Sequence, residues 1–125
     1  MSRQHGVYGW GLNYQGQCGV RNVKNVESEA LREDVRVPTA IDIPSDADIV
    51  SIKCGFSHSG CMSADHEVFL WGRNENNECC GGDEDVVWSP QCVNEAVMKQ
   101  SKMGRIVDFF LGNYTTMFLL SDGGQ

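Results

Sequence analysis

The sequence has few basic residues and no long hydrophobic run, and both absences exclude classes of protein. Ten Lys and Arg stand against seventeen Asp and Glu, so the net charge is −7. Because a nucleic-acid-binding surface usually carries clustered Lys and Arg, we expect no direct nucleic-acid binding. No apolar run approaches the ~18–20 residues of a membrane span, and no apolar leader precedes residues 7–10. These features predict a cytoplasmic or nuclear protein without a membrane span, with six reduced cysteines.

Proline is also scarce, with three residues, whereas glycine is abundant, with fourteen. Glycine at this density indicates many tight turns and therefore favours an all-β fold over a helical one. The acidic residues are unevenly spread, because residues 65–85 contain seven acids and a single base, Arg73. We interpret this stretch as a solvated loop, with contact to a basic partner as the alternative.

An internal repeat runs through the chain. Residues 7–13 match residues 68–74 at an offset of 61, and residues 49–55 match residues 106–112 at an offset of 57. The matched segments keep their order and only the spacers differ in length, which is typical of surface loops. The structural positions that the repeat predicts are Trp10, Gly11, Asn13, Gly55, His58, Trp71, Gly72, Asn74 and Gly112.

The two repeat blocks, residues 7–67 and residues 68–125, each indicate about four short strands. The pattern is clearest in the hairpin at residues 49–64, which is followed by a tight turn; Asp122-Gly123 is the counterpart of that turn. A repeat of this length with about four strands selects a β-propeller. We therefore predict one partial propeller domain over the whole chain. Residues 94–103 are interpreted as a loop, with a helical turn as the alternative.

Two segments resemble a known family. Residues 7–19 resemble the start of a repeat of the regulator of chromosome condensation family, and residues 52–62 are similar to its Gly-x-x-His signature. The sequence departs from the family pattern at Cys18, Lys53 and Gly60, and the second block is more diverged. The resemblance implies a seven-bladed propeller, of which this all-β chain would supply about two four-stranded blades.

The tryptophans divide into two groups. Trp10 and Trp71 end equivalent strands, so we expect both to be buried and to pack one blade against the next. Trp88 lies outside the repeat, after the acidic stretch, and is interpreted either as an exposed anchor or as buried under the loop. The candidate partner contacts are Trp88, Asp83, Glu84 and Asp85.

Metal or catalytic chemistry is not indicated. Cys54, His58 and Cys61 have the spacing of a partial zinc site, but their counterparts in the second block are Leu, Thr and Phe, which cannot all bind metal. We interpret the cysteines as small core residues and His58 as a core residue hydrogen-bonded to backbone. The sequence thus predicts no metal site, no cofactor and no catalytic residues.

The resemblance alone does not fix a function, because members of the family serve as exchange factors, as modules of larger proteins and as a photoreceptor. The photoreceptor interpretation needs Trp and Arg where Phe56 and Ser57 stand, so we set it aside. We expect a protein-binding module, in its specific version a guanine-nucleotide exchange factor or regulator for a Ran-type small GTPase. The alternative is a regulatory or substrate-binding propeller segment of a larger enzyme, such as a ubiquitin ligase.

The number of repeats also carries an expectation. Propellers close with about 4–8 blades, and repeat proteins generally need about three or more units for stability. The sequence therefore predicts a segment of a longer propeller. Alone, such a segment is expected to be partly unfolded or to self-associate to complete a ring.

Overall fold

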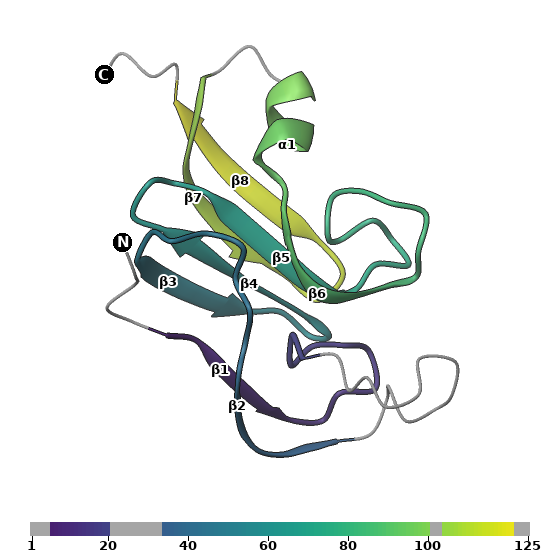
Figure 1. The fold of residues 1–125 in the computed structure, drawn as a ribbon. Coiled ribbons are helices and arrows are strands. Elements are labelled where there is room, and N and C mark those ends of the chain that lie inside the picture. Colours follow the sequence, from purple (N-terminus) through teal and green to yellow (C-terminus); the bar gives the residue numbers. More distant parts are fainter. Residues whose placement is uncertain (1–5, 21–33, 101–103, 122–125) are drawn as a thin grey trace.

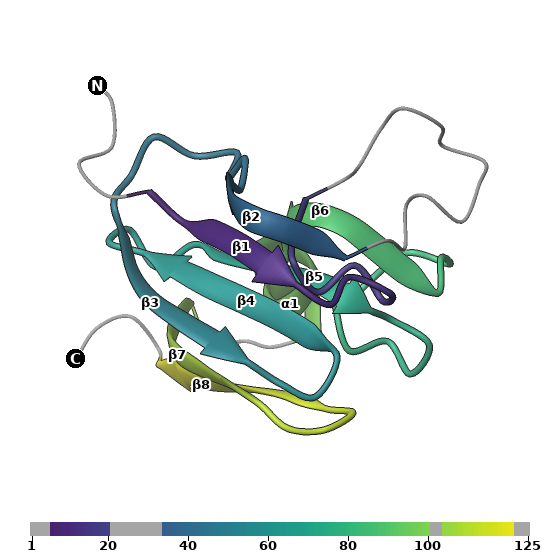
Figure 2. The same cartoon turned by 90° about the horizontal axis from the view of Figure 1, so that it is seen from below.

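The computed structural model describes residues 6–20, 34–100 and 104–121, and the turn predicted at Asp122-Gly123 lies outside these residues. The described part contains β1 (Tyr8–Gly11), β2 (Val35–Ala40), β3 (Ile49–Cys54), β4 (His58–Ser63), β5 (Val68–Arg73), β6 (Val86–Cys92), α1 (Asn94–Gln100), β7 (Arg105–Leu111) and β8 (Thr116–Ser121). Its strands form a β1–β2 sheet, a β3–β4–β5–β6 sheet and a β7–β8 sheet, all antiparallel. Figures 1 and 2 show the four-stranded sheet lying between the two smaller ones.

The predicted strands are confirmed, but the sheets are out of phase with the sequence blocks. The first block supplies β1 to β4 and the second supplies β5 to β8. The β4–β5 hairpin joins the two blocks, because β3 and β4 pair into one sheet with β5 and β6. The described residues therefore form one four-stranded sheet flanked by two half-sheets, instead of two four-stranded sheets side by side.

The core lies on both faces of the four-stranded sheet. Along β5, Val68, Phe69 and Leu70 are buried in succession, as expected for a strand that has a packed layer on each side. Ile106 and Phe109 of β7 cover one face and are also fully buried. The continuous apolar run of β5 therefore reflects its central place among the three sheets.

Two departures from the family pattern are explained by the contact between the four-stranded sheet and β7. Lys53 on β3 forms an ion pair with Asp108 on β7 (Nζ to Oδ1, 3.3 Å). A Cβ at Gly60 would lie 2.6 Å from Leu70 Cδ2 and 2.9 Å from Phe109 Cε2, so a larger residue there would require these two side chains to shift. Both residues thus serve the packing of one sheet on the next.

The prediction of a loop is wrong for residues 94–100, because Asn94–Gln100 is the helix α1, and residues 101–103 lie outside the described residues. The Asn94 side chain fixes the start of α1 against the neighbouring hairpin, since its Oδ1 accepts from Val68 N (2.7 Å) and its Nδ2 donates to His66 O (2.9 Å). Val97 and Met98 pack against the core. Tertiary packing stabilises this short helix, which would be marginal by itself.

Trp71 lies at the junction between the first sheet and the four-stranded sheet. It is 2% exposed, and its Nε1 donates a hydrogen bond to Gln17 O (3.0 Å) in the loop that follows β1. Gly19 of the same loop has a φ of +70°, and a Cβ there would lie 2.7 Å from Trp71 Nε1. The loop can approach the indole this closely because position 19 is glycine.

The expectation that Trp10 is buried like Trp71 is wrong, because Trp10 is 59% exposed. The cover on Trp71 comes from the loop around Gln17, which belongs to the preceding repeat unit. Within the described ranges, Trp10 has no corresponding loop against its indole. Its exposure therefore reflects the lack of a covering loop among the described residues and not a different local sequence.

The interpretation of all six cysteines as core residues is also corrected in part. All six are free thiols. Cys18, Cys61 and Cys79 are buried, and Cys80 is half-buried. Cys54, at the end of β3, and Cys92, at the end of the outer strand β6, are exposed, because neither position is covered by a neighbouring sheet in the described part of the chain.

We expect Trp71→Ala to lower the free energy of unfolding by about 3–5 kcal/mol, as large core truncations do. Trp10→Ala is the matched control, and because Trp10 is largely exposed its cost should stay within about 0.5 kcal/mol. Urea unfolding of dilute protein, followed by circular dichroism, measures both. An equal loss of unfolding free energy in the two variants would contradict the conclusion that Trp71 is buried and Trp10 is exposed.

Candidate functional site

The connections between strands that follow β1, β3, β5 and β7 gather at one end of the molecule, which we call the loop end (Figure 1). Arg73 N donates to Ser57 O (2.9 Å), which joins the end of β5 to the β3–β4 turn. The Phe56 ring meets the Tyr114 ring of the β7–β8 turn. The loop end comprises residues 12–20, 55–57, 74–85 and 112–115.

The loops after β1 and β5 begin with the same asparagine-centred structure. Asn13 Oδ1 accepts from Cys18 N (3.0 Å), and Asn74 Oδ1 accepts from Cys79 N (2.9 Å). Each Nδ2 donates to a carbonyl further along its own loop. Both amides are buried, so these bonds satisfy groups that would otherwise be costly to bury. The repeat positions Asn13 and Asn74 thus shape the two long loops.

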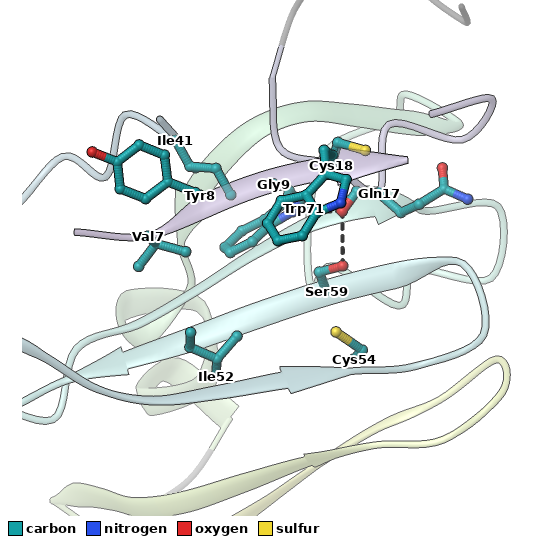
Figure 3. Close-up of a pocket in the computed structure, with 11 residues that line it drawn as sticks. Val7, Tyr8, Gly9, Gln17, Cys18, Ile41, Ile52, Cys54, Ser59 and Trp71 are labelled. Atoms are coloured by element: carbon teal, nitrogen blue, oxygen red, sulfur yellow. Dashed lines mark hydrogen bonds between the residues drawn. The ribbon is translucent and has the colours of Figure 1, made fainter. Parts of the chain in front are cut away.

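One carbonyl in each long loop binds the next sheet. Ser59 Oγ on β4 donates to Gln17 O (2.9 Å), and Figure 3 shows this bond between the first loop and the four-stranded sheet. At the equivalent place, Thr116 Oγ1 on β8 donates to Glu78 O (2.6 Å). The two hydrogen bonds are repeat counterparts and join three sheets in series.

His58 extends the second of these contacts. Its Nε2 lies 2.9 Å from Thr116 Oγ1, and the imidazole is 1% exposed. Because Thr116 donates its hydroxyl hydrogen to Glu78 O, its oxygen accepts from His58 Nε2–H, which assigns the tautomer. Burial lowers the pKa of His58 below the ordinary 6.5, against the opposing charge of Glu78. His58 is a buried core residue, as predicted, and its Nε2 also bonds to the Thr116 side chain.

A buried charge pair distinguishes the second long loop from the first. Glu78 is 2% exposed, and its Oε2 accepts from Arg73 Nη1 at 2.5 Å. The equivalent residues in the first loop are the uncharged Gln17 and Leu12. The carboxylate and its cation therefore appear together in one copy and are replaced together in the other, as expected when a buried charge requires a partner.

An exposed aromatic pair is the loop end's most distinctive feature. The rings of Phe56 and Tyr114 are 66% and 48% exposed and meet edge to face, with centroids 6.0 Å apart. The guanidinium of Arg73 lies 4.8 Å from the centre of the Tyr114 ring. The repeat counterparts of the two aromatic residues are Asn113 and Ser57, so the scaffold does not require aromatic rings there. Sequence reasoning missed this pair; the signal was an aromatic residue whose counterpart is polar.

The candidate partner contacts do not lie together as one patch. Asp83, Glu84 and Asp85 are exposed in the long loop after β5. Trp88 lies on β6 and is half-buried, with its ring beside Gly16 of the first loop. The structure thus places the three acids at the loop end and places Trp88 against the neighbouring loop.

The remaining glycines that the repeat predicts lie at or next to strand ends at the loop end. Gly55 N and Gly112 N donate to the carbonyls of His58 (2.8 Å) and Thr115 (2.9 Å), which closes the two hairpin turns. Gly11 and Gly72 lie at the ends of β1 and β5 with nearly equal φ values of 110° and 112°. The repeat positions therefore hold equivalent places in both copies.

The described residues contain no group of three or more His, Cys, Asp or Glu side chains arranged to hold a metal ion. Burial raises the pKa of the Cys79 thiol to about 12 and that of Cys80 to about 11. Both thiols are therefore protonated at neutral pH and are poor nucleophiles. The helix found in the described part of the chain is too short to cross a membrane.

Comparison with known proteins gives the context for this surface. Residues 4–62 and 65–119 match the family model of the regulator of chromosome condensation (RCC1) repeat. The chain is 33% identical over 72 residues to the ultraviolet-B receptor UVR8 of Arabidopsis thaliana, covering 58% of this chain and 14% of the receptor. It is 31% identical over 78 residues to the human probable E3 ubiquitin-protein ligase HERC6, covering 62% and 7%.

A third relative matches almost the whole chain. The RCC1-like G exchanging factor-like protein of Mus musculus is 29% identical over 121 residues, which cover 94% of this chain and 26% of the mouse protein. The chain thus spans about a quarter or less of the length of these three relatives.

Two solved structures share the fold. The crystal structure of human WBSCR16 superposes with a TM-score of 0.68 at 20% identity, over 96% of this chain and 28% of that protein. Prp20p of Saccharomyces cerevisiae, whose structure is described with its binding to Gsp1p and histones, superposes with a TM-score of 0.61 at 23% identity, over 91% and 26%. These likenesses confirm the predicted β-propeller blades.

We expect Arg73→Leu to destabilise the chain clearly, because it leaves the buried Glu78 carboxylate without its cation. Adding Glu78→Gln recreates the Leu12 and Gln17 pair of the first loop and should restore most of the lost stability. A double-mutant cycle of urea midpoints measures the coupling. A double variant no more stable than Arg73→Leu alone would show that charge pairing is not what allows Glu78 to be buried.

Proposed function

The chain belongs to the regulator of chromosome condensation repeat family, and on that premise we propose that it is a protein-binding β-propeller module whose loop end contacts the partner. The observation that carries this proposal is the exposed pair Phe56 and Tyr114, whose rings stand at positions where the repeat does not require an aromatic residue. Exposed aromatic side chains beside polar groups are typical anchors of protein interfaces.

The charge of the same surface indicates what the partner presents. Asp83, Glu84 and Asp85 are exposed in succession in the loop after β5, at the same end of the molecule as the aromatic pair, and the chain carries a net charge of −7. Arg73, the basic residue of this region, is already paired with Glu78 and Glu75. The proposed partner surface therefore combines an apolar spot for the aromatic rings with basic groups around it.

A small GTPase of the Ran type is the partner we propose. Two family relatives support it: the mouse relative carries the name of an exchanging factor, and the yeast Prp20p structure is described with binding to Gsp1p. In this role the propeller would promote nucleotide release by remodelling the nucleotide site of the GTPase. The nucleotide and Mg²⁺ would belong to the GTPase, so the chain itself needs no cofactor and no catalytic residue. We place this activity in the cytoplasm or nucleus.

A second candidate function is a regulatory or substrate-binding segment of a larger enzyme. The similarity to HERC6 favours it, because that protein is named as a probable ubiquitin ligase and this chain covers 7% of its length. In this case the loop end would bind a protein other than a GTPase, and catalysis would lie elsewhere in the larger enzyme.

The exchange-factor proposal is tested with a purified Ran-type GTPase loaded with a fluorescent GDP analogue. We expect the chain to bind this GTPase and to accelerate release of the nucleotide. Tyr114→Ala and Phe56→Ala should each weaken binding at least tenfold, about 1.4 kcal/mol, as the loss of an interface anchor does. Asn113→Ala, an exposed residue in the same turn as Tyr114, is the matched control and should bind normally.

The acidic residues provide a second measurement. A variant with Asp83→Asn, Glu84→Gln and Asp85→Asn should bind more weakly at low salt and lose most of the salt dependence of binding. No binding of any Ran-type GTPase would leave the second candidate function as the better account. Binding that is unchanged in both aromatic variants would contradict the loop end as the contact surface.

A further inference from the structure

We propose that the angle between the Phe56 and Tyr114 rings binds a lysine side chain of the partner protein, with the ammonium group against both aromatic faces. This binding rests on the proposed function, because it takes place at the same loop end and specifies what the partner inserts there. A single lysine supplies both an apolar stem and a positive charge. Phe56, Tyr114, Arg73 and Glu75 together form what we call the aromatic corner.

The two rings of the aromatic corner stand steeply to each other and are accessible. Their planes meet at 69°, their centroids are 6.0 Å apart, and both rings are exposed. A cation is attracted to an aromatic face when it lies within about 6 Å of the ring centroid. Because the two centroids are so close, one ammonium group in the angle between the rings lies within that range of both.

Tyr114 already contacts one cation within the chain. The guanidinium carbon of Arg73 lies 4.8 Å from the centre of the Tyr114 ring. Arg73 is held in this place by two carboxylates, the exposed one of Glu75 and the buried one of Glu78. The Tyr114 ring is thus placed in a group of charged side chains, where its electron-rich faces attract positive charge.

The shape of the aromatic corner favours lysine over arginine. A guanidinium is planar and stacks on a single aromatic face, whereas a lysine ammonium is a compact charge on a flexible stem. A compact group can enter the angle between two rings that meet at 69° and contact both of them. The four-carbon stem then packs against the exposed Phe56 ring, which would otherwise remain in water.

The charges beside the rings leave a surplus of negative charge. Arg73 carries one positive charge, whereas Glu75 and Glu78 carry one negative charge each, so the group has a net charge of −1. Arg73 contacts one oxygen of Glu75 at 3.2 Å, and the Glu75 side chain is 45% exposed. The Glu75 carboxylate can therefore accept a hydrogen bond from a second cation, such as a lysine ammonium of the partner.

The rest of the loop end has the charge expected of a surface that receives a basic side chain. Its residues, 12–20, 55–57, 74–85 and 112–115, include five acids and no Lys or Arg. Three of these acids, Asp83, Glu84 and Asp85, are exposed at the same end of the molecule as the rings. A surface of one sign attracts and orients a partner of the opposite sign before contact.

The internal repeat indicates that the ring pair is complete within two consecutive units. Phe56 and Asn113 are counterparts, and so are Ser57 and Tyr114. The ring contact thus joins the residue after the turn glycine in one unit to the second residue after it in the next. By the same rule, a unit before this pair would meet Ser57, and a unit after it would meet Asn113. Adjoining units would therefore contact the polar residues of these turns and not the two rings.

The first test uses blocked single residues as probes, so that no other contact contributes to binding. N-acetyl-lysine methylamide is titrated into the full chain, and the proton NMR signals of the probe are followed. We expect the methylene protons next to the ammonium to shift upfield, because protons over an aromatic face experience its ring current. N-acetyl-norleucine methylamide has the same stem without the ammonium and should bind about two- to fivefold more weakly, as expected for an exposed cation–π contact.

Two variants remove one aromatic face each and keep an apolar side chain. Phe56→Leu and Tyr114→Leu should each weaken binding of the lysine probe about two- to fivefold and reduce its preference over the norleucine probe. Tyr14→Leu is the matched control, because Tyr14 is a 55% exposed aromatic residue of the loop end outside the aromatic corner. It should leave binding of both probes unchanged. Circular dichroism checks that all three variants fold.

The contribution of the carboxylate is measured separately. Glu75→Gln removes the negative charge and should weaken binding of the lysine probe about two- to fivefold, as the loss of an exposed ion pair does. Binding of the norleucine probe should not change, because it carries no charge to pair with Glu75. Glu95→Gln, an exposed acid on the helix α1 outside the loop end, is the matched control and should bind both probes normally.

The probes also separate the lysine site from the choice of a GTPase as partner. Lysine binding at the aromatic corner without binding of any Ran-type GTPase would support the lysine site and overturn only the GTPase. GTPase binding that depends on Phe56, together with no binding of the lysine probe or with equal binding of norleucine, would overturn the lysine site and leave the loop end as the contact surface. Tighter binding of N-acetyl-arginine methylamide than of the lysine probe would also contradict it.

Discussion

A single peptide carbonyl in each long loop joins one sheet of this protein to the next. Gln17 O accepts hydrogen bonds from Ser59 Oγ and Trp71 Nε1, and Glu78 O accepts from Thr116 Oγ1. A buried asparagine at the start of each loop binds the backbone N–H of the residue that follows this carbonyl. The strands supply the sheets, but the stacking of the sheets depends on these two acceptors.

The difference between residues that pack the sheets and residues that do not indicates where a partner is expected to bind. The asparagines that shape the two long loops, Asn13 and Asn74, recur in both copies, so their identity is constrained by packing. Phe56 and Tyr114 are exposed at the loop end and have polar counterparts, so they are free of that constraint. A repeat scaffold thus separates residues that hold the fold from residues available to a partner.

Much of the fold could be predicted from the sequence, because the repeat marks strand order and the buried positions His58 and Trp71. The assignment of strands to sheets could not be predicted, because an internal repeat is compatible with any choice of the boundary between one unit and the next. The burial of Trp10 was wrongly predicted, because burial depends on a neighbouring unit and not on the strand itself. The Arg73–Glu78 pair and the Phe56–Tyr114 pair were not predicted, because both are tertiary contacts at positions where the copies differ.

The role of the loop carbonyl is tested most directly by comparing Thr116→Val with Thr115→Val. Thr116 lies in the contact between His58 and Glu78 O, whereas the neighbouring Thr115 is exposed. Native-state hydrogen exchange should show that Thr116→Val lowers protection in β4 and β8 together, by about 1–3 kcal/mol, because it leaves buried polar groups unpaired. Thr115→Val should leave protection in both strands unchanged. Equal protection in the two variants would contradict the claim that this carbonyl holds the sheets together.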